Sequence, residues 1–258
     1  MPFTLSHAAA ALPLRRLNLV WSAFLVGSMA PDLPYITGSE YRELGHKFPG
    51  VLLFTLPASW IALWLFQTAI KKPVVGLLPL GVQQRLQDQL GDFDFSGIAR
   101  RVTIATSLVL GIATHLVWDA FTHAYTWPWY RLGWLQSWIY VPFAGHMPMF
   151  MVLQYASTII GMVALAAWIL LWYRNTPPCK EAALPQPKSR VLIAFAICAV
   201  AAVAGFLRAI LLVGGFPISV KGWDFFLMYV GVTALAVAFW ELLLYCLLAT
   251  SLRTWSVS

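Results

Sequence analysis

Residues 149–173 read MFMVLQYASTIIGMVALAAWILLWY, a run of 25 residues without a charged side chain. At about 1.5 Å per residue, a helix of this length is longer than the roughly 30 Å hydrocarbon core of a bilayer is thick. The whole chain shares this character, because 60% of its 258 residues are hydrophobic and 10% are charged. In soluble domains, about 45–50% of residues are hydrophobic and about 25% are charged. The composition excludes a disordered chain, argues against a soluble globular domain, and indicates an integral membrane protein.

Other apolar runs predict further membrane spans. With the first stretch they give five long spans: Val51–Ile70, Val102–Ala124, Met149–Tyr173, Val191–Gly214 and Phe225–Ala249. A sixth run, Leu17–Ala30, is shorter and ends at Pro31. We therefore expect an all-α fold, a polytopic integral membrane bundle of about six transmembrane helices.

Basic residues are concentrated in alternate loops. The loops 71–101 and 174–190, together with Arg15, Arg16 and Arg253, hold 12 Lys and Arg residues, whereas the opposite loops hold four. Because basic loops are retained in the cytoplasm, this bias predicts that both termini are cytoplasmic. The net charge of +7 then belongs to loops at an anionic leaflet, and no nucleic-acid partner is expected.

A polar, Pro-rich stretch divides the chain. Residues 174–190 form a predicted cytoplasmic linker between an N-terminal membrane bundle, residues 1–173, and a C-terminal transmembrane helix pair, residues 191–258. The pair contains two charges within its spans. We expect Arg208 to extend toward the outer headgroups, and the sequence identifies no partner for Glu241.

The loop 125–148 is rich in amphipathic rings, with four Trp and three Tyr residues. Such rings settle at the level of the lipid headgroups. The loop is interpreted as an aromatic belt on an interfacial segment, or alternatively as a lid or lipid-docking surface over a site.

Three side chains that bind metals lie within one predicted span. His115, Asp119 and His123 are spaced i, i+4, i+8, so they share one face of a helix. Nitrogen and carboxylate donors on one face suit a metal such as zinc. The alternative interpretation is a buried hydrogen-bond network. Ionisable groups within a membrane are expensive, which favours a functional role.

Further histidines and a carboxylate flank the first predicted spans. Asp32 follows the first, and His46 precedes the second, so both are expected at the outer mouth of the bundle with His115. His146 lies on the same side and is a weaker candidate. His7 precedes Arg15-Arg16 and reaches this site only if residues 5–12 fold back, with Pro13 helping the break.

Several motifs resemble an uncharacterised bacterial membrane-protein family, the domain of unknown function 4184. They are Met1-Pro2-Phe3-Thr4-Leu5-Ser6-His7-Ala8-Ala9-Ala10, Gly27-Ser28-Met29-Ala30-Pro31-Asp32, Gly45-His46 with Pro49-Gly50, and His115-Leu116-Val117-Trp118-Asp119-Ala120-Phe121-Thr122-His123. The resemblance covers the whole chain, with every motif before residue 147. It implies a location in the bacterial cytoplasmic (inner) membrane.

The order His, Pro-Asp, His, His-x-x-x-Asp, His is also similar to that of inner-membrane metal-dependent hydrolases, zinc-dependent phospholipases C and three-zinc nucleases. This more distant resemblance implies a zinc site and the hydrolysis of phosphate esters. The metal ligands that it implies are His7, Asp32, His46, His115, Asp119 and His123, with Asp119 also the catalytic residue that bridges metals or orients water. The second late His-x-x-x-Asp of those enzymes is missing after His146, so the ligand count fits one or two metals.

These observations predict a metal-dependent hydrolase of a phosphate ester in a membrane lipid or lipid-linked substrate. The alternative is a non-enzymatic transporter or channel-like protein whose His/Asp line carries protons or a divalent cation. A haem protein is a third hypothesis. It leaves Asp32 and Asp119 without a role, because haem uses two axial histidines from facing helices.

Overall fold

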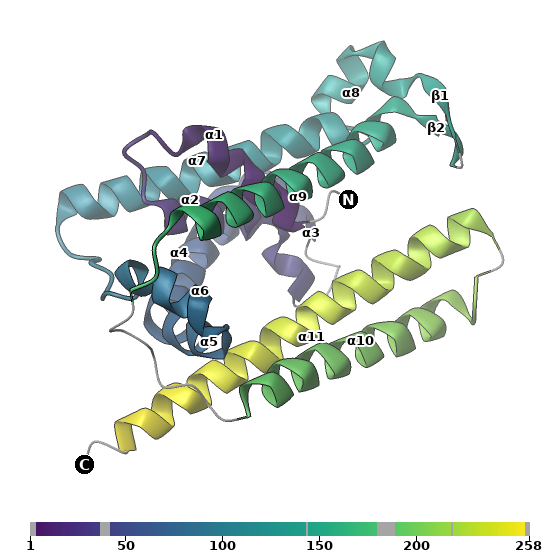
Figure 1. Ribbon diagram of the computed structural model, residues 1–258. Coiled ribbons are helices and arrows are strands. Elements are labelled where there is room, and N and C mark those ends of the chain that lie inside the picture. The colour runs from purple at the N-terminus through teal and green to yellow at the C-terminus, as the bar shows by residue number, and fades with distance from the viewer. Residues whose placement is uncertain (1–3, 37–41, 143, 180–188, 218, 256–258) are drawn as a thin grey trace. The chain divides into compact units, whose positions relative to one another are not determined.

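The structure is a computed structural model that describes residues 4–36, 42–142, 144–179, 189–217 and 219–255 (Figure 1). Short helices come first: η1 (Thr4–Ala10), α1 (Ala11–Leu14), α2 (Trp21–Met29), η2 (Ala30–Ile36) and α3 (Arg42–His46). One long helical stretch follows as η4 (Val51–Thr55), α4 (Leu56–Leu65), η5 (Phe66–Ile70) and α5 (Lys71–Leu77). The rest comprises α6 (Leu80–Arg85), η6 (Gln87–Gln89), α7 (Ile98–Thr122), α8 (Trp127–Arg131), η7 (Gly133–Gln136), β1 (Trp138–Val141), β2 (Gly145–Pro148), α9 (Met149–Asn175), α10 (Arg190–Val213) and α11 (Val220–Trp255).

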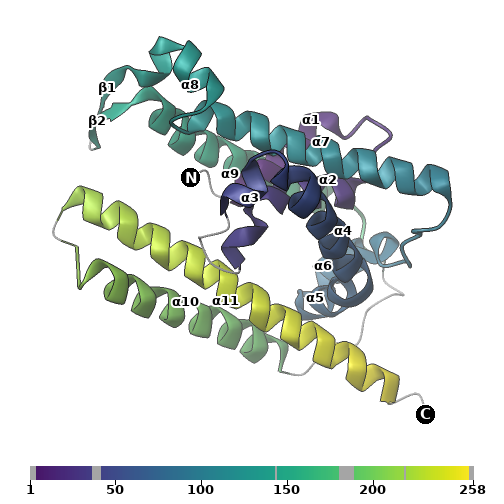
Figure 2. The ribbon, with the colours of Figure 1, turned by 180° about the vertical axis from the view of Figure 1, so that it is seen from behind.

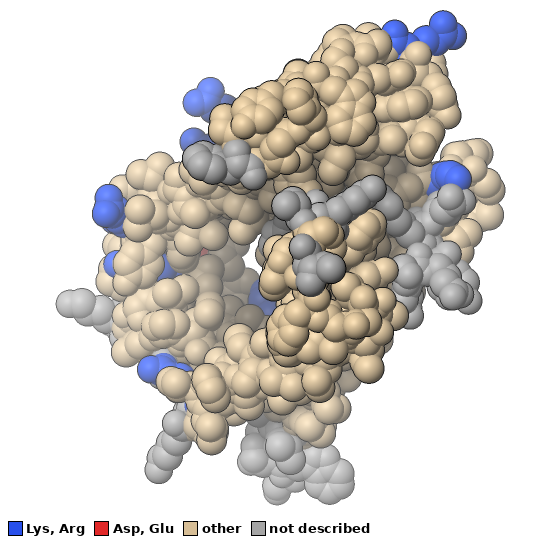
Figure 3. All heavy atoms as spheres, turned by 90° about the vertical axis from the view of Figure 1, so that its right-hand side faces the viewer, with Lys and Arg blue, Asp and Glu red and all other residues tan. Residues whose placement is uncertain are grey.

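Five helical segments are long and apolar enough to cross a membrane. They are Val51–Leu77, Ile98–Arg131, Met149–Asn175, Arg190–Val213 and Phe225–Ser251. The five long spans expected from the sequence are therefore confirmed, and the chain is an all-α membrane protein. Within the described residues, the sheet structure is the antiparallel hairpin β1–β2 in the aromatic loop. Uncharged residues cover most of the face shown in Figure 3.

The structure differs from the sequence prediction at Leu17–Ala30. This run forms the nine-residue α2, about 14 Å long, which is too short to cross a bilayer alone. The backbone N–H of Val20 donates to Ser107 Oγ in α7, whereas the carbonyl of Ser28 accepts from His115. The helix η1, which precedes α2 in the chain, also lies at the level of His115, because His7 stacks on that ring. Residues 4–29 therefore run along α7 and back, and the prediction of two cytoplasmic termini had counted a crossing here.

Glycine allows α2 and α7 to approach closely. A Cβ on Gly27 would collide with the backbone carbonyl of Leu108, and a Cβ on Gly111 would collide with that of Phe24. The buried residues of α7 recur every three or four positions, from Ile104 to Thr122, and form one continuous face. This face includes His115 and Asp119, so the approach of α2 brings its backbone against the polar part of α7.

The chain divides into two compact units. Unit 1 comprises Met1–Leu33, Arg42–Leu63 and Asp94–Asn175, and unit 2 comprises Pro34–Tyr41, Trp64–Phe93 and Thr176–Ser258. In unit 1, α7 and α9 lie side by side with η1 against α9 (Figures 1 and 2). In unit 2, α10 and α11 form a helical hairpin. The predicted division at 174–190 stays a prediction, and residues 180–188 of that linker lie outside the described residues.

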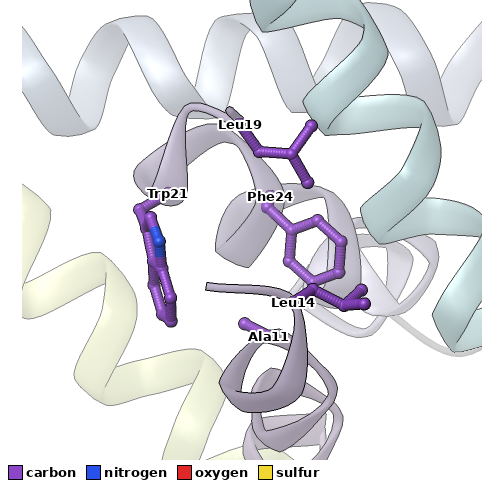
Figure 4. Close-up of a pocket in the computed structure, with 5 residues that line it drawn as sticks. All are labelled: Ala11, Leu14, Leu19, Trp21 and Phe24. Carbon is purple, nitrogen blue, oxygen red and sulfur yellow. The ribbon is translucent and has the colours of Figure 1, made fainter. Parts of the chain in front are cut away.

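A small apolar pocket lies where α1 turns toward α2. Ala11, Leu14, Leu19, Trp21 and Phe24 line it, and Figure 4 shows their side chains around it. No ionisable side chain is among these residues. The pocket reflects the packing of the returning N-terminal segment and is separate from the polar cluster described next.

Candidate metal centre

Four segments that are distant in the sequence meet at one polar cluster in unit 1. The helix α7 provides His115 and Asp119, with 0% and 7% of their surface exposed. Buried residues His7 of η1 and Asp32 of η2 face them, together with the half-buried His46 of α3. The structure thus brings together five of the six ligands expected from sequence and resemblance, and it places the sixth, His123, at the edge.

The folded-back N-terminal segment is what brings His7 to the cluster. Its ring stacks on that of His115, with centroids 3.9 Å apart, and it meets the edge of Trp118. Ser6 is fully buried against Gly161 of α9, where a Cβ would lie 3.0 Å from the Ser6 side chain. The N-terminal segment therefore folds back, as it must if His7 is to reach this site.

The loop before Val51 fixes His46. The hydroxyl of Thr55 donates to the carbonyl of Gly45 at 3.1 Å. A Cβ on Gly50 would collide with the carbonyl of Leu44, so the turn after His46 closes only around a glycine. These contacts hold the imidazole against α7.

The cluster contains two overlapping groups whose donor atoms could hold a metal ion, one of His7, Asp32 and His115 and one of His46, His115 and Asp119. The Nε2 atoms of His46 and His115 are 3.3 Å apart. His46 Nε2 lies 3.5 Å from Asp32 Oδ1 and 3.4 Å from Asp119 Oδ2, and His115 Nε2 lies 3.7 Å and 3.5 Å from the same oxygens. Bonds of about 2.0–2.2 Å to a tetrahedral zinc place its ligands about 3.3–3.6 Å apart. The distances of the two Nε2 atoms from each other and from the two carboxylates, 3.3–3.7 Å, are close to this separation.

The tautomer of His115 directs the lone pair of its Nε2 atom at other hydrogen-bond acceptors. Its Nδ1 lies 2.8 Å from the carbonyl oxygen of Ser28. A carbonyl only accepts, so Nδ1 carries the proton and neutral His115 presents the lone pair of Nε2. That lone pair faces carboxylate oxygens of Asp32 and Asp119. Acceptors crowded in this way repel one another unless a cation lies between them, and a backbone carbonyl on the outer nitrogen is the usual support of a metal-binding histidine.

Asp32 is held by a residue that the sequence analysis did not single out. The hydroxyl of Thr4 donates to Asp32 Oδ2 at 2.7 Å, which leaves Oδ1 directed at the histidines. Thr4 lies in the same N-terminal motif as His7, three residues before it. That spacing places both side chains on one face of a 3₁₀ turn, and it is the signal by which Thr4 could have been found.

Asp119 is placed to contact both sides of the cluster. Its Oδ2 faces His46 and His115, whereas its Oδ1 lies 3.5 Å from His7 Nε2 and 3.8 Å from His123 Nδ1. Asp119 Oδ1 and both ring nitrogens of His7 are buried without a hydrogen-bond partner in the described part of the chain. Buried polar atoms without partners are costly. A cation bound between His7 and Asp119 would remove that cost.

His123 lies outside the regular helix. The helix α7 ends at Thr122, and His123 has extended backbone angles, so the predicted i+8 position is not continued. Its Nδ1 lies 3.1 Å from the carbonyl oxygen of Asp119, which requires Nδ1 to carry a proton. Through Nδ1, His123 therefore contacts Asp119 rather than a metal.

The remaining sequence candidates lie elsewhere. His146 is exposed in β2 and contacts the ring of Tyr140, so it is not part of this cluster. In unit 2, Arg208 donates to Thr233 Oγ1 at 3.1 Å. Glu241 Oε2 is buried and has no hydrogen-bond partner among the described residues.

The protonation states of His7 in η1 and Asp32 in η2 suit metal binding. Burial, aided by His115, lowers the pKa of His7 to about 4, so this imidazole is neutral at neutral pH. Burial opposes the ionisation of Asp32, but the contacts with His46 and His115 and the Thr4 hydrogen bond outweigh it and lower the Asp32 pKa. Neutral histidines and ionised carboxylates are the forms that bind metals.

A family model described as a domain of unknown function, DUF4184, matches residues 1–247. The chain belongs to the DUF4184 family. The resemblance noted from the motifs is confirmed, and the match covers four of the five candidate spans completely and the fifth, Phe225–Ser251, up to residue 247. No curated protein and no solved structure matches the chain.

Proposed function

We propose that this DUF4184 protein is a membrane metalloenzyme that hydrolyses a phosphate ester of a lipid or lipid-linked substrate. The observation that carries the proposal is the pair of His46 and His115 Nε2 atoms, which lie 3.3 Å from each other and 3.4–3.7 Å from carboxylate oxygens of Asp32 and Asp119. Two carboxylates and two imidazoles neutralise a divalent cation within a membrane protein, where an unpaired charge is expensive.

Zinc is the metal that best fits these donors. Nitrogen and oxygen ligands at tetrahedral spacing are typical of zinc. A bound divalent metal supplies a Lewis acid and a source of hydroxide at neutral pH, the chemistry that phosphate-ester hydrolysis requires. Asp119, with one oxygen on each side of the cluster, is placed to bridge two metals or to accept a proton from the attacking water. We propose His7 as the additional ligand on the Oδ1 side.

The lipid character of the substrate follows from the location of the centre. It lies near the end of a 25-residue helix that is long enough to span the membrane, and the bias of basic loops supports an outer location for that end. The phosphate of a lipid lies at this depth. We place the protein in the bacterial cytoplasmic membrane, with the centre toward the outer leaflet.

The structure gives the transport alternative little support. The buried face of α7 continues from His115 toward its N-terminus with Ile112, Gly111, Leu108 and Ser107. Within the described residues, the ionisable side chains of α7 that are buried are His115 and Asp119. A path for protons or a divalent cation requires further polar groups along the helix.

A turnover assay tests the proposed reaction. Full-length protein in nanodiscs, supplied with zinc, is given a lipid phosphomonoester and a phospholipid, and released phosphate or headgroup is measured by phosphorus NMR. Turnover of one ester is expected, with a loss of about 10²-fold or more in Asp119→Asn and His46→Ala. Glu241→Gln, in unit 2, is the control and keeps the wild-type rate. Zinc-loaded protein that turns over neither ester, or an Asp119→Asn variant at the wild-type rate, would contradict the proposal.

A further inference from the structure

The segment that follows α7 is a compact structure with its aromatic rings outside. Residues 125–148, called here the aromatic platform, comprise α8, η7 and the β1–β2 hairpin. Leu135 is fully buried and Pro128 is buried, and η7 packs against α9 and α8 against α7. The platform is therefore a folded element with a defined outer surface rather than an irregular loop.

The rings on that surface are unusually exposed. Six Trp and Tyr residues of the platform have between 49% and 77% of their surface accessible: Tyr125, Trp127, Tyr130, Trp134, Trp138 and Tyr140. Trp138 and Tyr140 alternate with the less exposed Ile139 and Val141 along β1, so both rings lie on one face of the hairpin. Large exposed aromatic surfaces mark an interaction site, and Trp and Tyr favour the boundary between water and lipid.

The charge of the platform identifies an anionic partner. No Asp or Glu occurs between Asp119 and Glu181, and the one Lys or Arg of the platform is Arg131. Arg131 is exposed, at the end of α8. A cation in a stretch of sequence that is rich in Trp and Tyr and holds no acidic residue complements the phosphates of a headgroup layer.

The platform is fixed to the helix that carries the metal centre. The hydroxyl of Thr126 contacts the carbonyl oxygens of Ala120, at 2.6 Å, and of His123, at 3.2 Å, and its Oγ1 accepts from the backbone N–H of Trp129 at the start of α8. At the other end, the N–H of Met149 donates to the carbonyl of Ser137. From His115 to Thr122, where α7 ends, the rise is about 10 Å. The depth of the platform in the bilayer therefore sets the depth of the centre.

From these observations, we propose that the aromatic platform docks into the phospholipid headgroup layer and holds lipid headgroups beside the metal centre. The rings settle among the headgroups, and Arg131 binds a lipid phosphate. The docking is independent of the metal. The supply of substrate to the centre rests on the function proposed above, and the half-buried His46 and His123 form its more accessible side.

Depth-dependent quenching tests the docking in the full chain. Cys179 and Cys198, the exposed cysteines, are replaced by Ser, and a fluorophore is attached through Tyr140→Cys. Gln89→Cys, at an exposed position of the polar loop after α6, is the matched control. In nanodiscs, nitroxides on the lipid headgroup or upper acyl chain are expected to quench position 140 strongly and position 89 weakly, with aqueous iodide giving the reverse. Equal iodide quenching at both positions, with no quenching by nitroxide lipids at 140, would overturn the proposal.

The charge contribution is tested separately. In native mass spectrometry, Arg131→Gln is expected to retain less phosphatidylglycerol than the wild type, and Arg131→Lys, which keeps the positive charge, serves as the control. Retention that is unchanged in Arg131→Gln would overturn the role of Arg131. Metal content is measured in the same samples, because none of these residues belongs to the centre. A platform that fails to dock while the metal is retained overturns only this inference, whereas loss of metal in the wild type overturns the proposed function.

Discussion

Two pairs of helices in this protein approach closely through glycine, but their interiors differ. In α2 and α7 the glycines are Gly27 and Gly111, each against a backbone carbonyl of the other helix. In α10 and α11 it is Gly205, whose Cβ would lie 2.5 Å from the carbonyl of Val230. Small residues at a contact are the general means by which membrane helices approach. Close packing alone therefore does not distinguish the functional part of the chain.

The polar groups make the difference. The contact between α2 and α7 buries Ser28, Ser107 and His115, and the N-terminal segment adds His7 to the same interior. Among its described residues, the α10–α11 pair buries Ala201, Ala209 and Phe226 together with the polar Thr233 and one carboxylate oxygen of Glu241. Because polar groups are expensive within a membrane, their concentration in one pair indicates where function lies.

The largest expected effect comes from filling the glycine contact in unit 1. Gly111→Val forces α2 away from α7 and moves the Ser28 carbonyl from His115, so we expect loss of metal together with destabilisation of about 1–3 kcal/mol or more. Gly205→Val is the matched change in unit 2, expected to lower the melting temperature without changing the metal content of the folded protein. Metal analysis and thermal unfolding in detergent measure both. Equal loss of metal in the two variants would remove the distinction between the pairs.

A smaller effect is expected at Thr4, which touches the centre only through Asp32. Thr4→Ala leaves the carboxylate free to turn, and metal affinity should fall about 10–100-fold, as for other residues that orient a ligand. Thr4→Ser keeps the hydroxyl and should restore most of the affinity. A competition titration with a chelating dye measures this, and Ala and Ser variants with the same affinity would show that the hydrogen bond does not position Asp32.

The smallest effect is expected at the Arg208–Thr233 hydrogen bond of unit 2. Arg208 is exposed, so Thr233→Val should change the free energy of unfolding by about 1 kcal/mol or less. Metal content should stay at the wild-type value. A Thr233→Val variant that loses metal would mean that the helix pair contributes to the centre, contrary to the comparison drawn above.

Much of the fold could be predicted from the sequence, because membrane spans are encoded in local composition. The five long apolar runs became helices. Leu17–Ala30 did not become a span because long-range contacts decide its course. Val20 contacts Ser107 and Ser28 contacts His115, and neither contact is visible in a hydropathy pattern.

The members of the centre that could be predicted are those whose positions depend on helix geometry alone. His115 and Asp119 share a face because they are one turn apart on α7. His123 departs because the helix ends one residue earlier, and helix ends are poorly encoded in the sequence. The positions of His7 and Thr4 depend on the packing of η1 against α9, in which Gly161 leaves room for Ser6. Loop charge had placed His7 on the opposite side.

Metal content is the most direct test of the centre. Inductively coupled plasma mass spectrometry is applied to detergent-purified wild type, Asp119→Ala, His115→Ala and, as a control in unit 2, Glu241→Gln. We expect about one or two zinc ions per chain in the wild type and in Glu241→Gln, and none in the other two variants at preserved helical content. Zinc-supplemented wild type without bound metal, or Asp119→Ala and His115→Ala variants that keep it, would contradict the metal centre.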